Sequence, residues 1–259
     1  MSTALATQTS AMNATPRHDF FTAIHKGQRK ELFAATVLAG TIDWEDAAAA
    51  NDFVARWSKL TTMLEAHAAH EHKHFFPLLD RHAPEIVAQV EAAHDDLEQE
   101  LITLIDTIAV AADKRSHEHG LTVYRQVSSF VANYLLHILE EETRVMPAIW
   151  QHCTDAEIHA ARLAFQADQS PAGVVRSRRA MLTSITRAEL VTLALGVQRG
   201  STEEEFTAFM TDARQLLAQP EWNRLNQAIW PRHEELCDDV GGVPVGPSQP
   251  AYVSRAART

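Results

Sequence analysis

Two pairs of residues in this sequence have the spacing that places metal ligands on one face of a helix. His67 stands four residues before Glu71, and His137 stands four residues before Glu141. Side chains four residues apart on a helix lie one above the other, with Cβ atoms roughly 6 Å apart. Imidazole nitrogen and carboxylate oxygen both bind transition-metal ions. Each pair can therefore supply two ligands to a metal ion.

The two pairs belong to a repeat within the chain. A shift of 70 residues places one His-x-x-x-Glu pair on the other and also places Pro77 on Pro147. A shift of 69 places HKGQRKEL, which begins at His25, on HDDLEQEL, which begins at His94. Each half thus supplies one lone histidine and one pair. A single pair is usually a weak surface contact, whereas two pairs in register are much more specific.

Four long helices are expected to position these residues. They are predicted over residues 17–38, from after Asp43 to about residue 80, from Pro84 onward, and over residues 121–152. The histidines and glutamates of the repeat fall on the apolar stripes of these helices, as His94 does between Val90 and Leu97. Short connections between long helices predict an all-α, up-down-up-down four-helix bundle.

Six polar side chains would then converge in the core of the bundle: His25, His67, Glu71, His94, His137 and Glu141. Buried carboxylates without partners are costly, so this core requires compensating positive charge. A pair of divalent or trivalent cations supplies that charge.

Other residues are weaker candidates. Three histidines of the second helix are expected to divide between contacts with the ligands and solvent: His70, His72 and His74. His117 and His119 are predicted in a solvated loop. Glu98, four residues after His94, is a candidate additional ligand.

The composition agrees with a cation-binding protein. The net charge of −11 argues against nucleic acid and anionic membranes as partners. Thirteen of the fourteen histidines lie in residues 1–170, which concentrates ligands in that part. No membrane span or secretory signal is recognisable. Cys153 and Cys237 share no motif, which suits a reducing compartment, so we predict a cytoplasmic protein with no identifiable protein partner.

The chain is expected to divide into four parts. Residues 1–16 and 237–259 are predicted to be disordered, and residues 17–170 form the predicted bundle. A helical appendage is predicted over residues 175–236, after the expected linker QSPAGVVRS.

Two capping boxes are expected outside the four long helices. Thr154 with Glu157 should open a short helix, and Ser201 with Glu204 should open a helix of the appendage. Trp222 and Trp230 are expected to dock the appendage, which shows no recognisable chemistry.

Residues 17–152 resemble the hemerythrin-like (HHE cation-binding) family. The resemblance rests on a lone histidine on the first and third helices, and on His-x-x-x-Glu before a proline on the second and fourth. It implies a bundle that holds two non-haem iron ions. The implied ligands are the six residues named above, with Glu71 and Glu141 bridging the irons.

The sequence departs from the oxygen-carrying hemerythrins at two positions. These place a second histidine four residues after the first on the third helix, where this chain has Glu98. Their fourth helix ends in His-x-x-x-x-Asp, and that spacing here reaches Glu142 instead of Glu141. The ligand set is one histidine poorer, which argues against reversible oxygen carriage.

Other metal sites fit less well. Ferritin-like di-iron proteins use Glu-x-x-His pairs, which do not occur here at matching positions. A structural zinc site would favour several cysteines.

Two functions remain open on these ligands. The first is a module that binds or senses O₂, NO or iron; the alternative is a di-iron enzyme acting on hydrogen peroxide or nitric oxide. Tyr134 and His74 are the nearest candidates for a general acid by helical position. A third hypothesis is that the appendage transmits iron occupancy to a partner.

Overall fold

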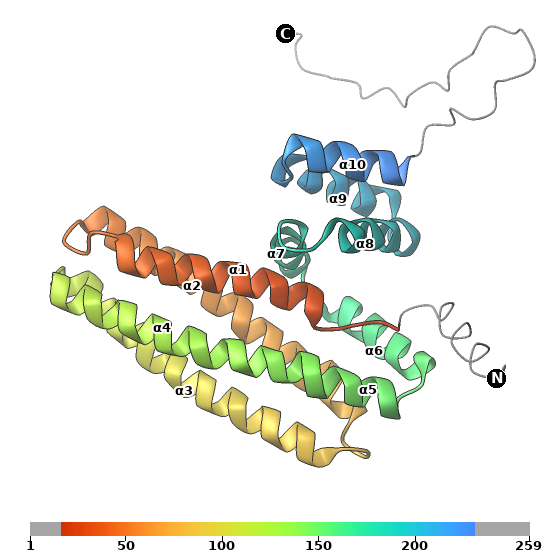
Figure 1. Cartoon of the computed structure of the whole chain (residues 1–259), viewed down its shortest axis with the longest axis horizontal. Coiled ribbons are helices and arrows are strands. Elements are labelled where there is room, and N and C mark those ends of the chain that lie inside the picture. Colours follow the sequence, from red (N-terminus) through yellow and green to blue (C-terminus); the bar gives the residue numbers. More distant parts are fainter. Residues whose placement is uncertain (1–16, 231–259) are drawn as a thin grey trace, which may run out of the picture.

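The computed structural model describes residues 17–230, and every regular element in that range is helical (Figure 1). The all-α prediction is therefore confirmed. The predictions of disorder at residues 1–16 and 237–259, and the last residues of the predicted appendage, fall outside the described range. None of the described helices is long and apolar enough to cross a bilayer.

Four long helices lie side by side and form the body of the molecule (Figure 1). They are α1 (Thr22–Thr41), α2 (Ala47–His70), α3 (Pro84–Lys114) and α4 (His117–Glu140). α1 packs against α2 and α4, and α3 packs against the same two helices. Each helix therefore turns one face toward a common core, as the apolar stripes require.

Two hydrophobic clusters fill this core, and the histidine of each helix falls between them. On α3, Leu97 belongs to one cluster, Val90 belongs to the other, and His94 lies between the two. On α1, His25 lies in the same way between Phe21 and Leu32. Polar side chains are thus held deep in the body because apolar packing continues on both sides of them.

Both metal-ligand pairs end in a turn of π-helix, which the sequence had not predicted. α2 runs into the π-turn η1 (Glu71–Phe75) and the 3₁₀ turn η2 (Phe76–Leu78). α4 runs into the π-turn η3 (Glu141–Val145), followed by α5 (Met146–His152). Proline lacks an N–H and crowds the carbonyl four residues earlier, so a wider turn relieves both problems before Pro77 and Pro147.

Several predicted helix ends were wrong by a few residues. α1 starts at Thr22, where the Asp19 carboxylate accepts hydrogen bonds from the backbone N–H groups of Phe21 and Thr22. Asp46, not Asp43, caps α2 by accepting a hydrogen bond from the N–H of Ala48 at 2.8 Å.

The fourth long helix also starts earlier than predicted. Ser116 caps α4, so His117 and His119 lie in its first turn and not in a loop. The Ser116 Oγ also lies 2.6 Å from His119 Nδ1, which gives that histidine a local structural partner.

The C-terminal helices have a hydrophobic core of their own. After α6 (Asp155–Asp168), which has the predicted capping box, come α7 (Pro171–Leu182), α8 (Arg187–Gly200), α9 (Glu203–Leu216) and α10 (Gln219–Ile229). α7 covers most of the segment predicted to be a linker, which corrects that prediction, and it packs on α1. The α9 capping box is Thr202 with Glu205, one residue later than predicted.

The two tryptophans of the appendage differ in their surroundings. Trp222 packs against the core of α7–α10, whereas Trp230 is 48% exposed and lies beside Phe206. Both contacts lie within the appendage, so they do not test the prediction that these tryptophans dock it onto another part.

A glycine in α4 provides a test of the packing at the end of the body. A Cβ on Gly120 would lie 2.2 Å from Cδ1 of the buried Trp44, whereas one on the exposed Gly196 of α8 would meet nothing within 4 Å. We expect Gly120→Ala to lower the free energy of unfolding by about 2–3 kcal/mol. Gly196→Ala should raise it by up to about 1 kcal/mol, because alanine favours the helix.

Denaturant titration of both variants measures these changes. Equal stability of Gly120→Ala and the wild type would show that Trp44 does not occupy this position.

Candidate metal centre

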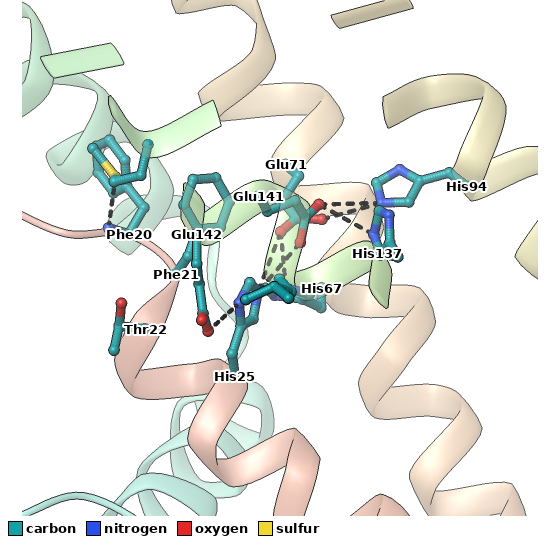
Figure 2. Close-up of polar contacts among 12 residues, drawn as sticks. Phe20, Phe21, Thr22, His25, His67, Glu71, His94, His137, Glu141 and Glu142 are labelled. Atoms are coloured by element: carbon teal, nitrogen blue, oxygen red, sulfur yellow. Dashed lines mark hydrogen bonds and ion pairs between the residues drawn. The ribbon is translucent and has the colours of Figure 1, made fainter. Parts of the chain in front are cut away.

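The six predicted ligands meet in the core of the body (Figure 2). α1, α2, α3 and α4 each supply one histidine, and the two π-turns begin with the two glutamates: His25, His67, Glu71, His94, His137 and Glu141. Glu71 and Glu141 are fully buried, as is His25. The repeat therefore brings together side chains that are up to 116 residues apart, counted from 25 to 141.

The first half of the centre is formed by the histidines of α1 and α2. The Nε2 atoms of His25 and His67 lie 2.9 Å apart. Glu71 Oε1 lies 2.8 Å from His67 Nε2, and Glu141 Oε2 lies 3.3 Å from His25 Nε2. These four residues form a group whose ligand atoms all lie within 4.8 Å of one another.

The second half is formed by the histidines of α3 and α4. Glu141 Oε1 lies 3.2 Å from His137 Nε2 and 3.5 Å from His94 Nε2. Glu71 Oε2 lies 3.5 Å from the same nitrogen of His94. Each carboxylate thus turns one oxygen toward each pair of histidines, and Figure 2 shows the two glutamates between the pairs.

The donor set fits cations better than it fits a hydrogen-bond network. Within residues 17–230, none of the four buried carboxylate oxygens of Glu71 and Glu141 forms a hydrogen bond of good geometry, although histidine nitrogens lie as close as 2.8 Å. Burial and the neighbouring Glu141 raise the pKa of Glu71 to about 8. Burial would also raise the pKa of Glu141, but His137 and His94 lower it below the usual range. A shared pair of cations would offset the cost of burying two carboxylates without hydrogen bonds. Both carboxylates would bind the ions as ligands, and the ions would neutralise their charge.

Glu142 supports His25 from outside the centre. Its Oε1 lies 3.1 Å from His25 Nδ1, and the Arg29 guanidinium donates to both of its oxygens, at 2.6 and 3.2 Å. Partial burial opposes ionisation, but His25 and Arg29 lower the pKa of Glu142 to about 2. Because the carboxylate is charged, His25 donates from Nδ1 and keeps the Nε2 lone pair for a metal.

Another histidine supports the second half in a similar way. His72 Nε2 lies 3.1 Å from His94 Nδ1, and His72 Nδ1 lies 3.3 Å from the half-exposed Glu91. The Nδ1 atom of His94 therefore faces away from the carboxylates, while its Nε2 faces them. Of the three uncertain histidines of α2 and η1, His72 is the one that contacts a predicted ligand.

The remaining candidates lie outside this cluster. His74 Nε2 contacts Asp168 of α6 at 3.0 Å, and the His70 ring packs edge-on against Phe165 of the same helix. Glu98 is exposed and belongs to neither metal-ligand group.

Sequence reasoning missed three residues around the centre, although their spacing offered a signal. Gln28 and Arg29 stand three and four residues after His25, and Glu91 stands three residues before His94. Such positions share a helix face with the ligand and can support it. Tyr134, which had been considered, is buried, and the centre of its ring lies 5.8 Å from that of His137.

Comparison with known proteins agrees with this geometry. The model of the hemerythrin HHE cation binding domain matches residues 17–162, which include all six predicted ligands. Searches of curated proteins and of solved structures found no significant match. With more than half of its length matched, the chain belongs to the hemerythrin HHE cation-binding domain family.

Proposed function

We propose that this protein is a non-haem di-iron protein that binds a small diatomic or peroxide ligand. The observation that carries the proposal is the position of the two buried glutamates, each with one oxygen toward either histidine pair. Such an arrangement suits two ions with two bridging carboxylates. The proposal includes a hemerythrin-type up-down-up-down bundle with α7–α10 as an appendage, and a cytoplasmic location inferred from the cysteines.

The chemistry of the donors supports iron. The family binds metal cations, typically iron, and a mixture of imidazole and carboxylate suits iron better than a cysteine-rich structural zinc site does. The two metal-ligand groups found in residues 17–230 contain histidine and glutamate only. When bound, iron would supply redox chemistry and a site for O₂, NO or peroxide.

A specific observation favours the enzyme as a second candidate. The side chain of Tyr134 is buried beside the centre, where burial and the charges of Glu71 and Glu141 raise the pKa of its hydroxyl well above the usual value. The hydroxyl therefore stays protonated and can donate a hydrogen bond to a bound ligand. A pKa so far above neutral makes it a poor proton donor, so its contribution to peroxide or nitric oxide chemistry would be that hydrogen bond.

Iron analysis tests the di-iron assignment. Protein loaded anaerobically with Fe²⁺ and then desalted should contain about two irons per chain, as in other di-iron bundles. His94→Ala should lose at least one of them, because His94 Nε2 faces both carboxylates. His74→Ala is the matched control and should retain both, since His74 contacts Asp168 instead.

One tightly held zinc and no iron in the wild type would contradict this function. Full iron content in His94→Ala would instead contradict the ligand assignment.

A further inference from the structure

Gln28 is a fully buried amide that forms no hydrogen bond of good geometry within the described part of the chain. Its side chain has no exposed surface, and neither Nε2 nor Oε1 forms a hydrogen bond within the described residues 17–230. A buried amide without partners destabilises a protein substantially. Its presence therefore needs a reason other than packing.

The internal repeat shows that packing alone would accept an apolar residue at this position. The 69-residue shift that places His25 on His94 places Gln28 on Leu97. Leu97 is buried in the hydrophobic core, as expected for the third residue after a core histidine. One half of the repeat thus carries a leucine where the other half carries an amide.

Gln28 lies next to the predicted centre. It follows His25 by three residues on α1 and therefore shares a helix face with it. Burial and the charges of Glu71 and Glu141 raise the pKa of the Tyr134 hydroxyl, and the nearby Gln28 amide partly offsets this rise. The approach of the two groups falls short of hydrogen-bond geometry. Gln28 is thus beside Tyr134, and Tyr134 is close to both carboxylates.

We propose that Gln28 determines ligand specificity by hydrogen-bonding a small ligand held at the metal pair. The inference rests on the proposed di-iron function and specifies the class of ligand. The amide N–H₂ donates to an anionic oxygen or nitrogen, and Oε1 accepts from a hydroxylic ligand such as hydrogen peroxide. Nitric oxide, which carries neither a charge nor a proton, gains little from these contacts. Gln28 should therefore favour anionic and peroxidic ligands over nitric oxide.

The test is Gln28→Leu, which copies the residue of the other half of the repeat. Azide is the anionic probe for the oxidised, iron-loaded protein, and nitric oxide is the probe for the reduced one. We expect the dissociation constant of azide to rise about tenfold, since one charge-assisted hydrogen bond is lost. The dissociation constant of nitric oxide should change less than about threefold, because nitric oxide makes no charge-assisted hydrogen bond to the amide. The iron content should remain that of the wild type.

A measurement on the metal-free protein provides a second readout. Leucine removes the unpartnered amide, so metal-free Gln28→Leu should have a higher Tm than the metal-free wild type. The matched control is Gln126→Leu on α4, whose Oε1 is also buried and has no hydrogen-bond partner among residues 17–230. Gln126 stands eleven residues before His137, about 16 Å along the helix, so this variant should bind azide like the wild type.

The outcomes separate this inference from the proposed function. Unchanged azide affinity in Gln28→Leu, or an equal loss of azide and nitric oxide affinity, would overturn the role of Gln28. Loss of iron from this variant would also overturn it, because Gln28 would then act on the metal ligands. A wild type without two irons would overturn the proposed function itself, while the Tm comparison would still show whether the buried amide lacks a partner.

Discussion

Glu141→Ala should lose most of its iron from both halves of the centre. Glu141 Oε2 faces His25, and Oε1 faces His94 and His137. One substitution therefore removes a ligand from each ion and also removes half of the negative charge that binds them. We expect iron content to fall from about two per chain to well below one, since loss of a metal ligand costs more than the roughly 10–100-fold lost with a supporting contact. Metal analysis after desalting measures this change.

The neighbouring glutamates provide controls for this prediction. Glu140 pairs with Arg144 on the surface, so Glu140→Ala should retain its iron. Glu142 hydrogen-bonds the outer nitrogen of His25, and Glu142→Ala should weaken iron binding by roughly 10–100-fold without abolishing it. Abolition of binding by Glu142→Ala alone would show that the repeat had selected the wrong carboxylate.

The positions of the predicted ligands could be read from the sequence because helical geometry fixes them. His67 and Glu71, like His137 and Glu141, lie four residues apart, and the repeat places both pairs on apolar stripes. The π-turns that begin at the two glutamates were not predicted, although Pro77 and Pro147 follow them at the same distance. A proline shows that a helix must adjust, but packing decides whether it kinks, ends or widens.

Tertiary contacts explain why the predicted linker was wrong. The Pro and Gly of QSPAGVVRS favour a loop, yet Pro171 fits the first turn of α7, and Ser170 caps this helix by accepting from the N–H of Gly173. α7 then packs on α1, where a Cβ on Gly27 would lie 3.0 Å from the Ala180 Cβ. That close approach depends on two segments far apart in the chain, so local sequence could not indicate it.

The contact between α7 and α1 identifies where the third hypothesis, transmission of iron occupancy to a partner, could be tested. Lys26 of α1 pairs with Glu189 of α8 at 2.5 Å, and Lys30 donates to Thr183 Oγ1 at 2.6 Å. Between these lysines, Arg29 points to Glu142 and so to His25. Neighbouring positions of α1 therefore contact the appendage and the predicted centre.

The reduced, iron-loaded protein should react with O₂ irreversibly. The predicted set has four histidines, one fewer than oxygen carriers provide, and Glu98 is exposed and does not replace the missing one. An additional position is then open to water or a small ligand, and hard oxygen donors favour the ferric state. Protein reduced without oxygen, then exposed to O₂, should give an oxidised spectrum that persists under vacuum. Return of the reduced spectrum under vacuum would contradict this prediction and favour an oxygen carrier.

The oxidised protein should turn over hydrogen peroxide, with the Tyr134 hydroxyl, which stays protonated, as a hydrogen-bond donor beside the centre. We expect His94→Ala to lower the rate at least about 100-fold, because it removes a predicted ligand whose nitrogen faces both buried carboxylates. Tyr134→Phe should retain two irons and lose about tenfold in rate, because one hydrogen bond to the bound ligand is lost. The rates of both variants are measured as oxygen evolution or peroxide consumption per iron. His74→Ala is the control, since His74 contacts Asp168. Equal rates in Tyr134→Phe and the wild type would remove the tyrosine from the reaction, and absence of turnover in the wild type would favour a protein that only binds its ligand.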